Sequence, residues 1–120
     1  MKFEIEKKEK VVVVMTKVEK LDALVAPELK SEFVLVAKNG HKNIVLDMSD
    51  TRYCDSSGLS AVLVANRLCR DAGGSFVLCG LQPTVEKLIT ISQLDSVLKI
   101  TPTQNEAVDL VYMDEVERDL

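Results

Sequence analysis

Residues 47–59 have the sequence DMSDTRYCDSSGL, and this stretch decides the fold prediction. The apolar run at 44–46 ends at Asp47, and a polar segment separates it from an apolar helical pattern that begins at Ser56. A short β-branched run is typical of a buried strand, and Asp or Ser before a periodic apolar run is typical of a helix N-terminus. The stretch therefore predicts a strand, a short connection and a helix.

Strand-like and helix-like patterns alternate along the rest of the chain. The runs that predict strands are 3–6, 11–15, 44–46, 75–79 and 97–100, with a hairpin tip at 7–10. The residues that mark helix starts are Pro27, Ser56, Pro83 and Thr103. The resulting order, β-β-α-β-α-β-α-β-α, predicts an α/β sandwich with a mixed, mainly parallel sheet, an N-terminal β-hairpin and about four helices.

Composition excludes several classes of protein. A chain of 120 residues is the size of one domain, which we expect to span 1–120. A net charge of −4 with well-mixed acids and bases gives nucleic-acid binding little electrostatic basis. No apolar run approaches the ~20 residues of a membrane span, and the charged start MKFEIEKKEK is not a secretory signal. We therefore expect a cytoplasmic protein without membrane insertion.

The cysteines and the histidine do not suggest a metal site or a cofactor. The three cysteines, Cys54, Cys69 and Cys79, have no paired spacing, which argues against a disulfide framework or a metal site. The single histidine, His41, lies in a predicted loop beside Gly40. We expect no cofactor and no metal.

The turn Asp55-Ser56-Ser57-Gly58 has three interpretations. Asp55 or Ser57 could simply cap the helix, Ser56 could be a nucleophile, or a hydroxyl there could receive a phosphate. A phosphate would meet the positive end of the helix and the charge of Asp55, so it would change the local field sharply. An enzyme is disfavoured because neither a suitable base nor a GxSxG motif is present.

The helix after Ser56 has a broad apolar face and a polar face. Leu59 and Leu63 fall on the polar side, close to Ser56. With Arg67 they predict a small stripe that docks a partner, although the two leucines could instead be tucked under a neighbouring loop.

The sequence resembles a STAS domain, specifically the single-domain anti-sigma factor antagonists of bacterial partner switching. The resemblance rests on D-M-S at 47–49 and Y-C-D-S-S-G-L at 53–59, and it extends over nearly the whole chain. It implies a binding protein without catalytic residues, whose unmodified form binds an anti-sigma factor that is also a GHKL-type serine kinase. It further implies phosphorylation of Ser56, reversal by a PP2C-type phosphatase, and a helper or capping role for Ser57.

The sequence departs from the family in two places. The loop at 18–22 keeps its acids, including Asp22 at the expected partner surface, but lacks a glycine that the family usually has. Cys54 replaces a larger apolar residue and is interpreted as a packing residue, with a redox role as the alternative. A scaffold subunit of a stress-signalling assembly, or an accessory of a lipid transporter, is a second use of the same fold.

Overall fold

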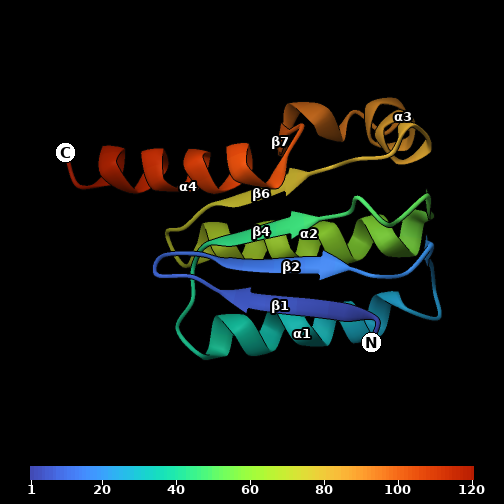
Figure 1. Ribbon diagram of the computed structural model, residues 1–120, viewed down its shortest axis with the longest axis horizontal. Coiled ribbons are helices and arrows are strands. Elements are labelled where there is room, and N and C mark those ends of the chain that lie inside the picture. Colours follow the sequence, from blue (N-terminus) through green and yellow to red (C-terminus); the bar gives the residue numbers. More distant parts are fainter.

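The computed structural model describes residues 1–120 and centres on a five-stranded sheet in the order β1-β2-β4-β6-β7 (Figure 1). The main-sheet strands are β1 (Phe3–Lys7), β2 (Val12–Thr16), β4 (Ile44–Asp47), β6 (Phe76–Cys79) and β7 (Lys99–Thr101). β1 is antiparallel to β2, and the other neighbours are parallel. The carboxyl ends of β2, β4, β6 and β7 therefore meet at one edge.

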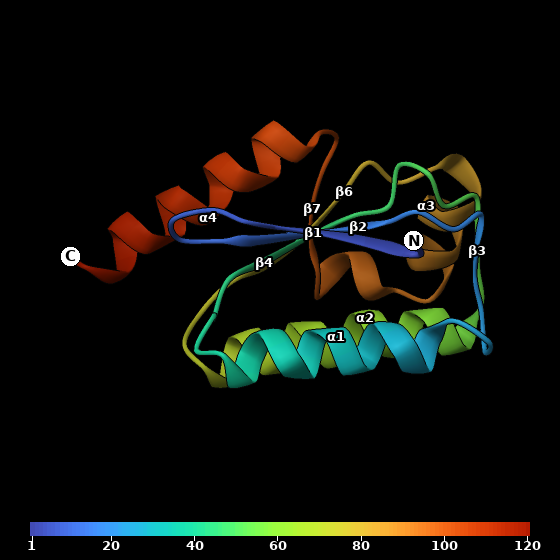
Figure 2. The same ribbon diagram turned by 60° about the horizontal axis from the view of Figure 1, so that its bottom comes forward.

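Helices cover both faces of the sheet, as Figure 2 shows with the sheet seen edge-on. α1 (Ala26–Lys38) and α2 (Ser56–Asp71) lie side by side on one face, and α4 (Gln104–Arg118) lies on the other. α3 (Pro83–Ile91) lies near the carboxyl ends of the strands.

The alternation of side chains along β2 divides the core into two layers. Val12 and Val14 pack into the larger cluster beneath α1 and α2, whereas Val11 and Val13 pack into the smaller cluster beneath α4. Since successive residues of a strand point to opposite faces, a continuous valine run is what a doubly covered strand requires.

The predicted architecture is confirmed: the sheet is mixed and mainly parallel, the N-terminal hairpin is present, and there are four α-helices. Two segments expected as connections instead form short parallel strands, β3 (Lys20–Leu21) and β5 (Tyr53–Cys54). A two-residue strand is too short to show a period of two, so the sequence pattern misses it. β7 also begins later than expected, because a 3₁₀ turn (Leu94–Ser96) precedes it.

Hydrogen bonds and ion pairs hold α4 near the amino end of the sheet. Glu115 Oε1 accepts hydrogen bonds from Asn43 Nδ2 (2.8 Å) and Arg118 Nη1 (2.7 Å). Asp114 Oδ2 accepts one from Lys99 Nζ (2.6 Å). The Asn43 bond lowers the pKa of Glu115. Burial alone would raise the pKa of Asp114, but hydrogen bonds from Lys99 and Ser75 and the charges of Lys99 and Arg118 together outweigh it, and that pKa is lowered too.

These lowered pKa values predict that acid weakens the attachment of α4. A carboxylate whose pKa is depressed on folding contributes stability above its unfolded pKa, near 4, and loses it as the pH falls further. Asp114→Asn should lower the free energy of unfolding by about 1 kcal/mol at neutral pH. The difference from the parent protein should shrink below roughly pH 4 in urea titrations at several pH values.

Asp109→Asn is the matched control, because Asp109 is an exposed carboxylate of the same helix and forms no ion pair. An Asp114→Asn deficit that stays constant from pH 7 to pH 3 would contradict this account.

Candidate functional site

The first turn of α2 is built on Asp55. Its backbone is extended (φ −109°, ψ −171°), and its Oδ1 accepts hydrogen bonds from Ser57 N (2.9 Å) and Gly58 N (3.1 Å). Asp55 is therefore the helix cap, as expected, and it satisfies two amides that have no partner within the helix. Ser57 is not the cap but a half-buried residue of the first turn.

The small β3–β5 sheet holds the chain on its way into α2. Leu21 pairs with Cys54, and Asp55 N donates to Leu21 O (3.3 Å). Gly58 fits tightly against this sheet, because a Cβ there would lie 2.5 Å from both Leu21 O and Cys54 Sγ. The glycine of the D-S-S-G motif is thus required for the close approach of α2 to the small sheet.

The D-M-S half of the motif fixes the loop between β4 and β5. Asp47 Oδ1 accepts from Ser49 N (2.9 Å) and also from the Ser49 hydroxyl, while Oδ2 accepts from Gln104 Nε2 (2.9 Å). Ser49 O in turn accepts from Gln82 Nε2 (2.6 Å). The Ser49 hydroxyl therefore already donates a hydrogen bond to Asp47, and the loop is tied to both α4 and the start of α3.

Ser56 is exposed, and its hydroxyl takes part in none of the side-chain hydrogen bonds of the protein. It lies beside a surface hollow of about 290 Å³ between α1 and α2. The other residues of this hollow are Ser57 and Ser60 of α2, Ala26, Pro27 and Lys30 of α1, and Ala23. The hydroxyl that begins α2 is consequently accessible from outside.

The expected exposure of Leu59 is wrong. Leu59 is only 8% exposed and belongs to the core cluster on the α1–α2 side of the sheet. The buried face of α2 extends to Leu59 in the first turn, where the neighbouring Gly58 packs against β3 and β5. Leu59 contributes to packing and is unavailable as a free docking residue.

Leu63 and Arg67 lie on the same side of α2 as Ser56. Leu63 is half-buried and packs against the core, whereas Arg67 is exposed. Eleven residues separate Ser56 from Arg67, or roughly 16 Å along the helix axis. Arg67 can reach only the margin of a contact centred on Ser56.

Asp22 closes the turn that leads into α1. Its Oδ1 accepts from Leu24 N (3.0 Å), and its carbonyl oxygen accepts from Val25 N (3.0 Å) and Ala26 N (2.8 Å). This turn presents Leu24, which is 87% exposed, and Tyr53 of the adjoining small sheet is 50% exposed. Sequence reasoning missed both: Leu24 lies in the apolar run at 23–26 and Tyr53 opens the Y-C-D-S-S-G-L motif, and neither pattern marks the side chain as exposed.

Cys54 behaves as a packing residue. Burial, together with the charge of Asp55, raises the pKa of its thiol to about 12. The reactive thiolate is therefore a very small fraction at neutral pH, which disfavours the redox alternative.

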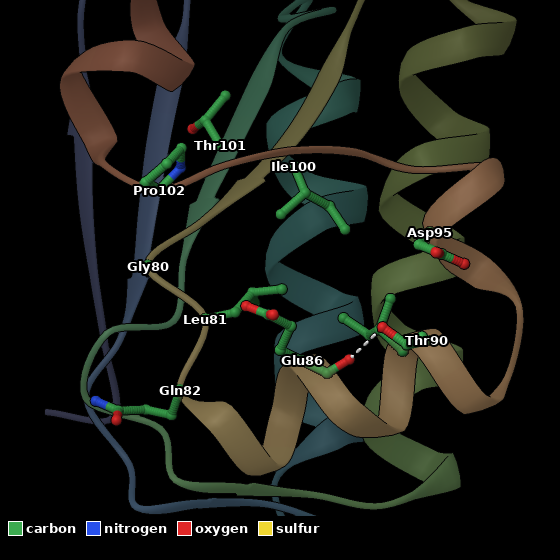
Figure 3. Close-up of a pocket in the computed structure, with 10 residues that line it drawn as sticks. Gly80, Leu81, Gln82, Glu86, Thr90, Asp95, Ile100, Thr101 and Pro102 are labelled. Carbon is green, nitrogen blue, oxygen red and sulfur yellow. Dashed lines mark hydrogen bonds between the residues drawn. The ribbon is translucent and has the colours of Figure 1, made fainter.

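A second, larger hollow does not contain the predicted site residues. It measures about 630 Å³ at the carboxyl ends of β6 and β7, and Figure 3 shows Glu86, Thr90 and Asp95 at its rim. The Thr90 hydroxyl donates to the Glu86 carbonyl oxygen (3.0 Å), so it is already engaged within α3. This hollow shares no lining residue with the one beside Ser56.

The comparison with known families agrees with the fold and the site geometry. A model of the STAS domain matches residues 2–107. The chain belongs to the STAS domain family. None of the helices of this STAS domain combines the length and the hydropathy that a membrane span needs.

Several relatives of this STAS domain are named as anti-sigma factor antagonists. BtrV of Bordetella bronchiseptica, named as an anti-sigma factor antagonist, is 30% identical over 68% of this chain and 71% of its own. A Thermotoga maritima structure under the same name has a TM-score of 0.85 at 28% identity and covers 92% of this chain and 94% of its own. Phosphorylated SpoIIAA of Bacillus, with a TM-score of 0.71 at 24% identity over 91% and 98% of the two chains, shows the same fold.

The contact at Gly58 predicts an unusual response to alanine. Glycine to alanine within a helix normally stabilises by up to about 1 kcal/mol, but here the added methyl overlaps the Leu21 carbonyl. Gly58→Ala should instead destabilise the STAS domain by about 2 kcal/mol in urea denaturation. Ser60→Ala, which adds no atom, is the control, and a stabilised Gly58→Ala variant would refute the contact.

The cap predicts a graded effect at Asp55. Asp55→Ala removes the acceptor for two amides and should cost about 1 kcal/mol of unfolding free energy, whereas Asp55→Asn keeps an acceptor and should cost much less. Equal losses in the two variants, measured by thermal and urea denaturation, would show that charge and not capping is the contribution of Asp55.

Proposed function

We propose that this STAS domain is an anti-sigma factor antagonist whose binding is switched by phosphorylation of Ser56. In its unmodified form it binds an anti-sigma factor that is also a GHKL-type serine kinase, and thereby releases a sigma factor. The kinase transfers a phosphoryl group to Ser56, which breaks the complex, and a PP2C-type phosphatase removes it.

The observation that carries the proposal is the state of the Ser56 hydroxyl. It is exposed and without a hydrogen bond, on a first turn that the Asp55 cap and the Gly58 contact hold in place. A kinase needs such an oxygen, fixed in position and open to solvent. By contrast, the Ser49 hydroxyl already donates a hydrogen bond to Asp47 Oδ1.

The neighbours of Ser56 make it a suitable centre for a protein contact. Leu24 and Tyr53 offer exposed apolar surface on the segments beside it, and Leu63 and Arg67 extend the same side of α2. Aromatic, aliphatic and arginine anchors around a small polar centre are typical of binding surfaces. A phosphate of about −2 at that centre would add uncompensated charge to a dehydrated contact, at a cost of several kcal/mol.

The position of His41 supports a binding role without catalysis. His41 precedes β4, at the amino end of the parallel strands, whereas Ser56 follows β4 and β5 at the carboxyl end. The only histidine is thus at the opposite edge of the sheet from Ser56 and does not pair with it as a general base.

Mass spectrometry after incubation with ATP and the anti-sigma factor kinase of the same organism tests the proposal. We expect one phosphate, on Ser56, and its loss in the Ser56→Ala variant. Ser57→Ala and Ser60→Ala are matched controls, because they remove neighbouring hydroxyls of the same turn and hollow and should still be phosphorylated. Phosphate found only on Ser57, or on no residue, would overturn the proposal.

A further inference from the structure

Lys30 is a cation without a partner beside Ser56. It is half-buried on α1 and forms none of the ion pairs or side-chain hydrogen bonds of the protein. It lines the hollow that Ser56, Ser57 and Ser60 also line. Lys30 is the only charged residue among those that line this hollow.

The backbone at the start of α2 offers little to a phosphate on Ser56. The amides of Ser57 and Gly58 already donate to Asp55, and the Leu59 amide donates to the Asp55 carbonyl oxygen (3.0 Å). Three amides of the first turn are therefore occupied before any phosphate arrives. These three amides are not free to receive the added anion.

Two carboxylates lie on the segments that lead into the helices beside this hollow. Asp55 precedes Ser56, and Asp22 follows Leu21, which pairs with Cys54 in the small sheet. A phosphate of about −2 on Ser56 would be repelled by both carboxylates. Among the residues of the hollow, only Lys30 can offset that repulsion.

We propose that Lys30 is the counter-ion of the phosphate carried by Ser56, and that it draws the phosphate into the hollow between α1 and α2. The inference rests on the proposed phosphorylation of Ser56. An ammonium beside a phosphate stabilises its dianionic form, as opposite charges do in other ion pairs. Lys30 thus sets the charge and the position of the group that blocks partner binding.

Titration of homogeneous phosphoprotein tests this inference without a kinase or a partner. The protein is made with phosphoserine encoded at position 56, and the second pKa of the phosphate is measured by ³¹P NMR. Lys30→Gln should raise this pKa by about 0.3 to 0.6, a two- to fourfold change in the dissociation constant, which matches a partly exposed ion pair.

Two variants serve as controls on the same helix. Lys30→Arg keeps the charge and should leave the phosphate pKa within about 0.1 of the parent value. Lys38→Gln removes an exposed lysine about two turns farther along α1, and it should have no effect. The ¹⁵N–¹H spectrum of each variant verifies that the fold is intact.

The outcomes separate this inference from the proposed function. A Lys30→Gln phosphoprotein whose pKa equals the parent value, or equal shifts in Lys30→Gln and Lys38→Gln, would overturn the counter-ion role. If the Lys30 shift appears but the kinase leaves Ser56 unmodified, the proposed function fails and the ion pair stands. If the kinase phosphorylates Ser56 but Lys30→Gln leaves the phosphate pKa unchanged, the proposed function stands and the counter-ion role fails.

Discussion

The close contact between the first turn of α2 and the small β3–β5 sheet is the constraint on which the site depends. Gly58 has no room for a side chain against the Leu21 carbonyl, and the carboxylate of Asp55 holds the two amides beside it. Together they fix where α2 begins and in which direction its first side chain projects. The accessible hydroxyl of Ser56 is a consequence of this packing.

The surrounding structure supports the same turn from several directions. Asp47 and Ser49 tie the β4–β5 loop to α4 and α3, and the turn at Asp22 brings α1 alongside α2. Lys30 of α1 reaches the Ser56 hollow only because these two helices are neighbours on one face of the sheet. A local motif of four residues is thus embedded in long-range contacts, which keep it rigid enough to present one hydroxyl to a partner.

Much of this architecture could be predicted because it depends on strong local patterns. The valines of β2, the proline and serine helix starts and the Asp55 cap have clear periodicity or capping chemistry. The wrong predictions concern features that tertiary contacts determine. β3 and β5 are too short to show a period. Leu59, which a helical projection alone places on the polar side, is buried in the core cluster. The importance of Leu24, Tyr53 and Lys30 likewise depends on spatial neighbours that one sequence does not reveal.

The account is tested most directly by the affinity of the protein for its anti-sigma factor, measured by calorimetry for three homogeneous forms. These are the unmodified protein and proteins carrying phosphoserine at position 56 or at position 57. We predict that phosphate on Ser56 weakens binding at least about 100-fold, which corresponds to roughly 3 kcal/mol. Ser57 is half-buried, and phosphate on Ser57 should not reproduce this loss of affinity unless it unfolds the first turn of α2. Equal affinities for the unmodified and Ser56-phosphorylated forms would contradict the account.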